Sequence, residues 1–105
     1  MKEDFFVVLC TASVNESEGI ARLLVEEKLA ACVNVAKVDS YYRWKCEFCK
    51  DGEALLIIKT EGKSNVDRII ERIKEIHSYE VPEIIAVPIV AGYDKYLAWI
   101  EESIE

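Results

Sequence analysis

Residues 31–60, which read ACVNVAKVDSYYRWKCEFCKDGEALLIIKT, decide the fold that the sequence predicts. Residues 31–44 are rich in Val and Tyr and contain neither Pro nor Gly, which is typical of one long strand. Asp51 and Gly52 form the strongest turn signal, because a type I′ hairpin turn needs positive φ at both central positions. Residues 53–60 are then the returning strand. This hairpin is too long for a small sheet, and since exposed strand edges usually pair with another chain, it predicts an oligomer.

The segment before the hairpin predicts a strand and a helix. Phe5 to Cys10 is a continuous apolar run, as in a buried strand. Asn15 is followed three residues later by the acidic Glu18, which is the pattern of a capped helix N-terminus. This helix is expected to end near Leu29, and its inward side chains are expected to be Ile20, Leu23, Leu24 and Val25.

The segment after the hairpin predicts a helix, a strand and a last helix. Ser64 is the expected cap of a helix whose apolar side chains recur at helical spacing: Val66, Ile69, Ile70, Ile73 and Ile76 or His77. Residues 83–91 predict a strand, and Pro88 within it favours a sheet edge or a bulge. Residues 93–104 predict a short helix capped at Asp94. The order strand-helix-strand-strand-helix-strand, with this terminal helix, predicts an α+β fold of the ferredoxin-like sandwich type.

Length and composition limit the class of protein. The 105 residues correspond to one domain, residues 1–105, and the net charge of −7 disfavours nucleic acid, which requires a basic patch. No stretch approaches the roughly 18 apolar residues of a membrane span, and no signal-peptide cleavage pattern follows Met1, so we expect a cytoplasmic protein. One His, no Gly-rich phosphate loop and no nucleophile elbow indicate that the chain is not an enzyme.

The four cysteines are expected to be thiols, metal ligands or redox groups in a reducing compartment. Cys46 and Cys49 form a C-x-x-C pattern, which suits a zinc half-site or a redox dithiol. Residues three apart in a strand point to opposite faces, however, so we favour two ordinary cysteines over a disulfide or an accessory metal site. Cys10 and Cys32 are expected to be buried. His77 is either a cation at a helix C-terminus or an imidazole ligand that, with thiolate, suits copper or zinc.

Six ordered blocks, which cover nearly the whole chain, resemble the CutA divalent-cation tolerance family. They are Val7–Ala12, Glu27–Asn34, Ser40–Trp44, Glu53 with Ile58–Thr60, His77–Ile84, and Gly92 with Tyr96, Leu97, Trp99 and Ile100. The resemblance implies a homotrimer, similar to the PII-like trimers, in which long hairpins pair between subunits. It also implies a role in tolerance of divalent metals, chiefly copper, without catalysis.

The same resemblance implies copper ligands at Cys10 and His77, with Cys32 as a third. Ile76 stands where a bacterial member of the family carries a further histidine, and Cys46 stands where the family usually carries Gly. The aromatic and charged residues also predict a pocket between subunits, lined by Trp44, Glu53, Lys59, Tyr79, Glu83, Tyr96 and Trp99, although ordinary subunit packing explains them equally well. A PII-like module that binds a small ligand and a trimeric scaffold for protein partners are the alternative functions.

Overall fold

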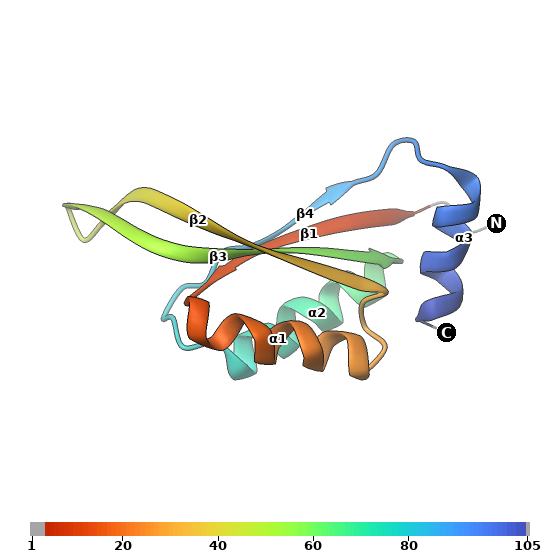
Figure 1. Cartoon of the computed structure of the whole chain (residues 1–105), viewed down its shortest axis with the longest axis horizontal. Coiled ribbons are helices and arrows are strands. Elements are labelled where there is room, and N and C mark those ends of the chain that lie inside the picture. The colour runs from red at the N-terminus through yellow and green to blue at the C-terminus, as the bar shows by residue number, and fades with distance from the viewer. Residues whose placement is uncertain (1–3, 105) are drawn as a thin grey trace.

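The computed structural model describes residues 4–104 and has four strands and three helices in the predicted order (Figure 1). The elements are β1 (Phe5–Ala12), α1 (Val14–Glu26), β2 (Cys32–Trp44), β3 (Glu47–Glu61), α2 (Lys63–Ile76), β4 (Ile84–Pro88) and α3 (Asp94–Ser103). The sheet has the order β2-β3-β1-β4, and each neighbouring pair is antiparallel. The predicted ferredoxin-like α+β fold with a terminal helix is confirmed, and β4, with Pro88 as its last residue, lies at an edge of the sheet.

The hairpin turn is not at the predicted position. Trp44 pairs with Glu47, and the two residues between them, Lys45 and Cys46, both have positive φ, as a type I′ turn requires. Asp51 and Gly52 lie inside β3 instead. A turn at those two residues would pair Thr60 with Arg43 and leave the apolar start of β2 without a partner strand. The long-range pairing of β2 therefore overrides the local preference of Asp-Gly for a turn.

The helix ends also differ from the sequence prediction. The N-cap of α1 is Ser13, not Asn15: its hydroxyl accepts a hydrogen bond from the Glu16 backbone N–H, and the Glu16 carboxylate accepts one from the Ser13 N–H. This capping box satisfies two N–H groups at the helix start, and α1 ends at Glu26 rather than near Leu29. The N-cap of α2 is Gly62, not Ser64, and the N-cap of α3 is Tyr93.

Helices α1 and α2 cover one face of the sheet (Figure 1). The inward side chains of these helices and every second residue of β1 and β3 form the main core, whose buried members include Val8, Cys10, Leu24, Leu56, Ile58, Ile69 and Ile73. Two inward residues of α1 are correctly predicted, Ile20 and Leu24, whereas Val25 is 42% exposed. Hydrophobic burial on this face is the main stabilising contribution to the fold.

The opposite face of the sheet is apolar and largely uncovered; we call it the open face. Register places Leu9 beside Ile57 and Ile85, and Val7 beside Val87, and these side chains alternate with the buried core residues. Ile85 and Val87 are 50% and 46% exposed. Helix α3 covers only the end of the sheet farthest from the hairpin tip, where Ile100 packs with Phe5 and Ala31 (Figure 1).

The hairpin of β2 and β3 projects beyond the rest of the molecule (Figure 1). Pairing of β3 with β1 stops at Ala54, so Val38–Trp44 and Glu47–Glu53 pair only with each other. This projection gives the chain its elongated shape of 47 × 25 × 21 Å. The predicted excess length of the hairpin is confirmed.

Candidate functional site

Cys10 and His77 meet at one backbone carbonyl group. The Cys10 thiol contacts the oxygen of Thr11 at 3.6 Å, and Nε2 of His77 lies 2.8 Å from the same oxygen. Cys10 comes from β1, and His77 is the C-cap of α2. The fold therefore brings together two of the three predicted metal ligands, although they are 67 positions apart in the sequence.

The Cys10 side chain is fully buried, at 0% exposure. Burial raises the pKa of its thiol to about 12, and the negative charges of Glu83, Glu16 and Glu53 act in the same direction. A thiol binds metal as thiolate, so a metal ion at Cys10 has to displace a strongly held proton. Cys10 in this conformation is a member of the core as well as a candidate ligand.

Both ring nitrogens of His77 have backbone partners. Nδ1 accepts a hydrogen bond from the Tyr79 N–H at 3.1 Å, and Nε2 faces the carbonyl oxygen of Thr11. This arrangement assigns the proton to Nε2, because Nδ1 is already an acceptor. His77 thereby joins the segment after α2 to the end of β1. Its ring also lies 4.6 Å from the ring of Tyr79.

Cys32, the third predicted metal ligand, lies elsewhere. It pairs with Lys59, which pairs with Val7, whereas Cys10 pairs with Leu56. Val7 and Cys10 are an odd number of residues apart in β1, so Cys32 and Cys10 point to opposite faces of the sheet. Among residues 4–104, the structure contains no group of three His, Cys, Asp or Glu side chains placed to hold a metal ion.

A pocket of about 650 Å³ lies where the projecting hairpin leaves the four-stranded part of the sheet. The hairpin forms one wall, and the segment between α2 and β4 forms the other. Its lining residues are Thr11, Ser40, Tyr41, Tyr42, Trp44, Asp51, Glu53, Tyr79, Glu80, Val81 and Glu83. Register places Thr11 and Glu53 on the same face of the sheet as Leu9 and Ile57, so the pocket continues from the open face.

Hydroxyl groups hold three of the carboxylates in the pocket. Tyr79 donates a hydrogen bond of 2.5 Å to Glu53, which is only 6% exposed, and Tyr42 donates one to Asp51. Thr11 lies 3.5 Å from Glu83. Burial, and then the hydrogen bond to Glu53, raise the pKa of Tyr79, so its phenol keeps its proton at neutral pH.

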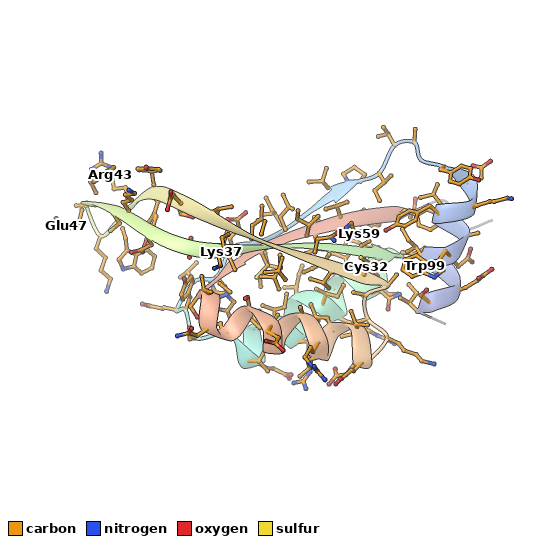
Figure 2. The ribbon with its side chains drawn as sticks, viewed as in Figure 1. Cys32, Lys37, Arg43, Glu47, Lys59 and Trp99 are labelled. Atoms are coloured by element: carbon orange, nitrogen blue, oxygen red, sulfur yellow. The ribbon has the colours of Figure 1, made fainter. Side chains whose placement is uncertain are left out.

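The predicted pocket is divided between the two ends of the molecule. Trp44, Glu53, Tyr79 and Glu83 line the pocket described above. Tyr96 and Trp99 belong to α3, and Lys59 and Cys32 lie at the same end of the sheet, whereas Arg43 and Glu47 mark the distant hairpin tip (Figure 2). Near α3, Lys59 bonds to Asn34, and the rings of Tyr96 and Trp99 are 5.5 Å apart.

The sequence prediction of the pocket missed several lining residues: Thr11, Ser40, Tyr41, Tyr42, Asp51, Glu80 and Val81. Ser40, Tyr42 and Trp44 alternate along β2, and this period of two places them on one face of the strand. That signal could have identified the hairpin wall. Glu80 and Val81 of the second wall could not have been found in this way, because they lie in a segment without regular secondary structure.

Cys46 and Cys49 are both free thiols near the hairpin tip. Cys46 occupies the turn and Cys49 pairs with Tyr42 in β3, so the expectation that both lie in a strand is wrong for Cys46. Three residues of extended chain span roughly 10 Å, which exceeds the separation of about 7 Å that a disulfide tolerates between its Cα atoms. Bridging the two residues within one chain would require the backbone to move.

Comparison with known proteins gives a consistent result. The family model described as CutA1 divalent ion tolerance protein matches residues 5–103. A divalent-cation tolerance protein CutA of Thermus thermophilus is 46% identical over 99 residues, which are 92% of this chain and 95% of the relative. A chloroplastic CutA of Arabidopsis thaliana is also 46% identical, over 92% of this chain but 54% of the plant protein.

Solved structures extend the likeness to the backbone. The periplasmic divalent cation tolerance protein CutA of Archaeoglobus fulgidus superposes with a TM-score of 0.91 at 36% identity, over 96% of this chain and 99% of that one. A PII-like CutA of Nostoc superposes with a TM-score of 0.89 at 34% identity, over 95% and 97% of the two chains. Among the residues described, no helix is both long and apolar enough to cross a membrane.

Proposed function

Because the chain belongs to the CutA1 divalent ion tolerance family, we propose that it acts in the tolerance of divalent metal ions as a non-enzymatic homotrimer. The family match over residues 5–103 is the observation that carries this proposal. We place the protein in the cytoplasm, where its four thiols stay reduced, although relatives with chloroplastic and periplasmic names belong to the same family.

The open face of the sheet supports the trimer. Monomeric proteins rarely leave a contiguous aliphatic surface uncovered, and here Leu9, Ile57, Ile85 and Val87 form one across three strands. The same molecule carries a projecting hairpin with two unpaired edges. A second copy of this chain is the occupant we propose, because it supplies both an aliphatic face and strand edges. The expected mass in solution is about three times the 12.0 kDa of one chain, measured by light scattering.

We propose that Cys10 and His77 form a weak copper site. A thiolate and an imidazole are the soft and intermediate donors that copper prefers, and the two groups already contact one carbonyl oxygen. Binding is expected to be weak because the thiol must lose a proton whose pKa is about 12 and because His77 must give up a backbone contact. In one chain Cys32 can join only from the other face of the sheet, so its role as a ligand requires a neighbouring copy.

A metal titration tests this site. Calorimetry with the reduced protein and Cu²⁺ or Co²⁺ is expected to show binding that the Cys10→Ser/His77→Ala double variant loses. Because Cys10 is a core residue, circular dichroism must show that the double variant is folded. Cys46→Ser is the matched control, because it also removes one thiol, but at the exposed hairpin tip. Unchanged metal binding in the folded double variant would remove Cys10 and His77 from the proposal.

The pocket favours a second candidate function, a PII-like module that binds a small ligand. Its volume of about 650 Å³ lies in the range of ligand sites, and aromatic side chains line it together with a few polar groups. Lys59, Tyr96 and Trp99 lie too far along the sheet to line it within one chain, so we propose that a neighbouring copy brings them to it. Screening metabolites by thermal shift tests this function. We expect at least one metabolite to raise the melting temperature of the protein in a saturable manner.

A further inference from the structure

Three consecutive residues after α2 bind three different elements of the fold. Nε2 of His77 faces a backbone carbonyl group of β1, and the N–H and hydroxyl of Ser78 donate hydrogen bonds to the Glu16 carboxylate of α1. The hydroxyl of Tyr79 donates a hydrogen bond to Glu53 of β3. These contacts fix the start of the irregular segment that forms the second wall of the pocket at the hairpin base.

A further hydrogen bond joins the first and third of these residues. The Tyr79 N–H donates to Nδ1 of His77 at 3.1 Å, so this ring nitrogen offers its lone pair to the backbone. A neutral imidazole has one lone pair and one N–H group in the plane of the ring. Both are in use in His77, because the N–H on Nε2 points to the carbonyl oxygen of Thr11 at 2.8 Å. Each nitrogen of the proposed metal ligand therefore already has a partner within the chain.

Metal binding at either ring nitrogen of His77 removes the hydrogen bond from Tyr79. Binding at Nδ1 takes the lone pair that the Tyr79 N–H uses. Binding at Nε2 displaces the proton from that nitrogen, and the neutral imidazole then carries its one proton on Nδ1, where two N–H donors would face each other. A metal-bound imidazole normally donates its second N–H to a carboxylate, a carbonyl group or water. The loss of the Tyr79 bond therefore does not depend on which nitrogen binds the metal.

The surrounding contacts direct this change towards the pocket. Ser78 is held by two hydrogen bonds to Glu16, at 3.1 and 2.7 Å, so the backbone next to α2 stays in place. The peptide group that carries the Tyr79 N–H has to turn away from the His77 ring, which lies 4.6 Å from the Tyr79 ring. Such a turn strains the bond of 2.5 Å between the Tyr79 hydroxyl and the buried Glu53.

From these contacts we propose that metal binding at His77 is coupled to the pocket. It releases Tyr79 from Glu53 and so rearranges the second wall of the pocket at Tyr79, Glu80 and Val81. This inference rests on the metal site proposed above and assigns Tyr79 as the residue through which that site regulates the pocket. Coupling between two binding sites is reciprocal, so a ligand that holds Tyr79 against Glu53 weakens metal binding by the same factor.

Amide hydrogen exchange with and without Zn²⁺ tests the coupling directly. Zn²⁺ binds both thiolate and imidazole, and NMR of the full-length protein in its native oligomeric state, with reduced thiols, follows each amide. At saturating Zn²⁺ we expect the Tyr79 amide to exchange about tenfold faster or more. The indole N–H signal of Trp44, which lines the pocket, should shift along the same binding curve. The Ser78 amide, which Glu16 holds, is the internal control and should keep its exchange rate.

His77→Ala distinguishes failure of the coupling from failure of the metal site. Calorimetry of this variant measures the Zn²⁺ that binds elsewhere, so only the binding that it lacks is assigned to His77. If part of the binding depends on His77 and the Tyr79 amide keeps its exchange rate, the coupling is wrong and the metal site stands. If none of the binding depends on His77, the metal site and the coupling are both wrong.

The Zn²⁺ affinity of Tyr79→Phe tests the sign of the coupling. This variant lacks the bond to Glu53, so the second wall moves at a lower cost, and we expect Zn²⁺ to bind about threefold more tightly. Tyr42→Phe is the matched control, because it removes a phenol that binds a carboxylate, Asp51, on the hairpin wall of the same pocket, and it should leave the affinity unchanged. Weaker binding by Tyr79→Phe would show that Tyr79 supports the metal ligand, and equal affinity in the two variants would show no coupling. Either result would overturn the proposal.

Discussion

At the scale of single residues, Cys10 is both a packed member of the hydrophobic core and a candidate metal ligand. It is fully buried in the main core and touches the carbonyl oxygen that His77 also contacts. Its type and position could be predicted from the sequence, because it ends an apolar run. Its partner across the fold could be named only through a family resemblance. The connection from α2 to β4, the strand that pairs with β1, places His77 there, and no local sequence pattern predicts the course of this connection.

The burial of Cys10 predicts an unreactive thiol. With a pKa of about 12, only about 1 in 10,000 Cys10 side chains is thiolate at pH 8, and the thiolate is the reactive form. We therefore expect native wild-type protein and Cys10→Ser to show the same number of thiols that react with Ellman's reagent. In guanidinium chloride the two should differ by one thiol. A native Cys10→Ser protein with one fewer reactive thiol would contradict this burial.

Glu16 is a second residue whose position couples distant segments. Its carboxylate accepts hydrogen bonds from the Ser13 N–H and hydroxyl at the start of α1, and from the Ser78 N–H and hydroxyl after α2. Burial alone would raise its pKa, but the bonds from Ser78 and Ser13 outweigh burial and lower the pKa below its usual range. Glu16 is therefore more acidic in the folded chain than in the unfolded chain.

Because the pKa of Glu16 is lowered in the folded chain, the contribution of Glu16 to stability depends on pH. A lowered pKa contributes stability above the unfolded value of about 4.3, and the contribution is lost as pH falls through the folded value. Glu16→Gln keeps the acceptor oxygen but not the charge, so we expect a cost of about 1 kcal/mol at pH 7 that shrinks below pH 5. Urea unfolding at several pH values measures it, with Glu18→Gln as a control on the same helix. A cost that grows towards pH 3 would contradict the assignment.

At the scale of elements, the strands and helices were largely predictable, whereas their ends were not. Apolar side chains at helical spacing predict α2, a continuous apolar run predicts β1, and a Val- and Tyr-rich stretch without Pro or Gly predicts β2. The turn at Lys45 and Cys46 was missed because neither residue type favours positive φ. The Gly that the family usually carries in place of Cys46 is the residue type that a positive φ favours. In the second wall of the pocket, Tyr79 and Glu83 were predicted, whereas Glu80 and Val81 were missed because an irregular segment has no period that marks its inward side chains.

The position of the turn can be tested by two substitutions. Cys46→Gly removes a side chain from a residue with φ of 67°, which relieves strain and is expected to stabilise the hairpin by about 1 kcal/mol. Gly52→Ala adds a methyl group that meets nothing within 4 Å at a position without positive φ, so it should change stability by less than about 0.5 kcal/mol. Chemical denaturation measures both. The reverse pattern, with a large cost for Gly52→Ala, would indicate a turn at Asp51 and Gly52.

At the scale of the whole molecule, one face of the sheet stabilises the subunit and the other face is available to partners. One face of the sheet is covered by α1 and α2 and closes the main core. The other face leaves aliphatic side chains uncovered and runs into the acidic pocket at the hairpin base. The continuous apolar runs in β1 and β3 could predict that both faces are apolar, because successive residues of a strand point to opposite faces. It could not predict which face the helices would cover, because that depends on the crossover connections.

The open face predicts that a single charge separates the subunits without unfolding them. Ile57 lies between Leu9 and Asn34 at the centre of this face, away from the side chains under the helices. Ile57→Lys places a charge where the proposed trimer excludes water, and the cost of burying it once in each subunit should favour monomers. Light scattering should then give about 12.0 kDa, with the circular dichroism of the folded chain retained. Val25→Lys, on the exposed side of α1, is the matched control and should leave the mass of the trimer unchanged. If Ile57→Lys keeps that mass too, the subunits associate through another surface, with the projecting hairpin as the next candidate.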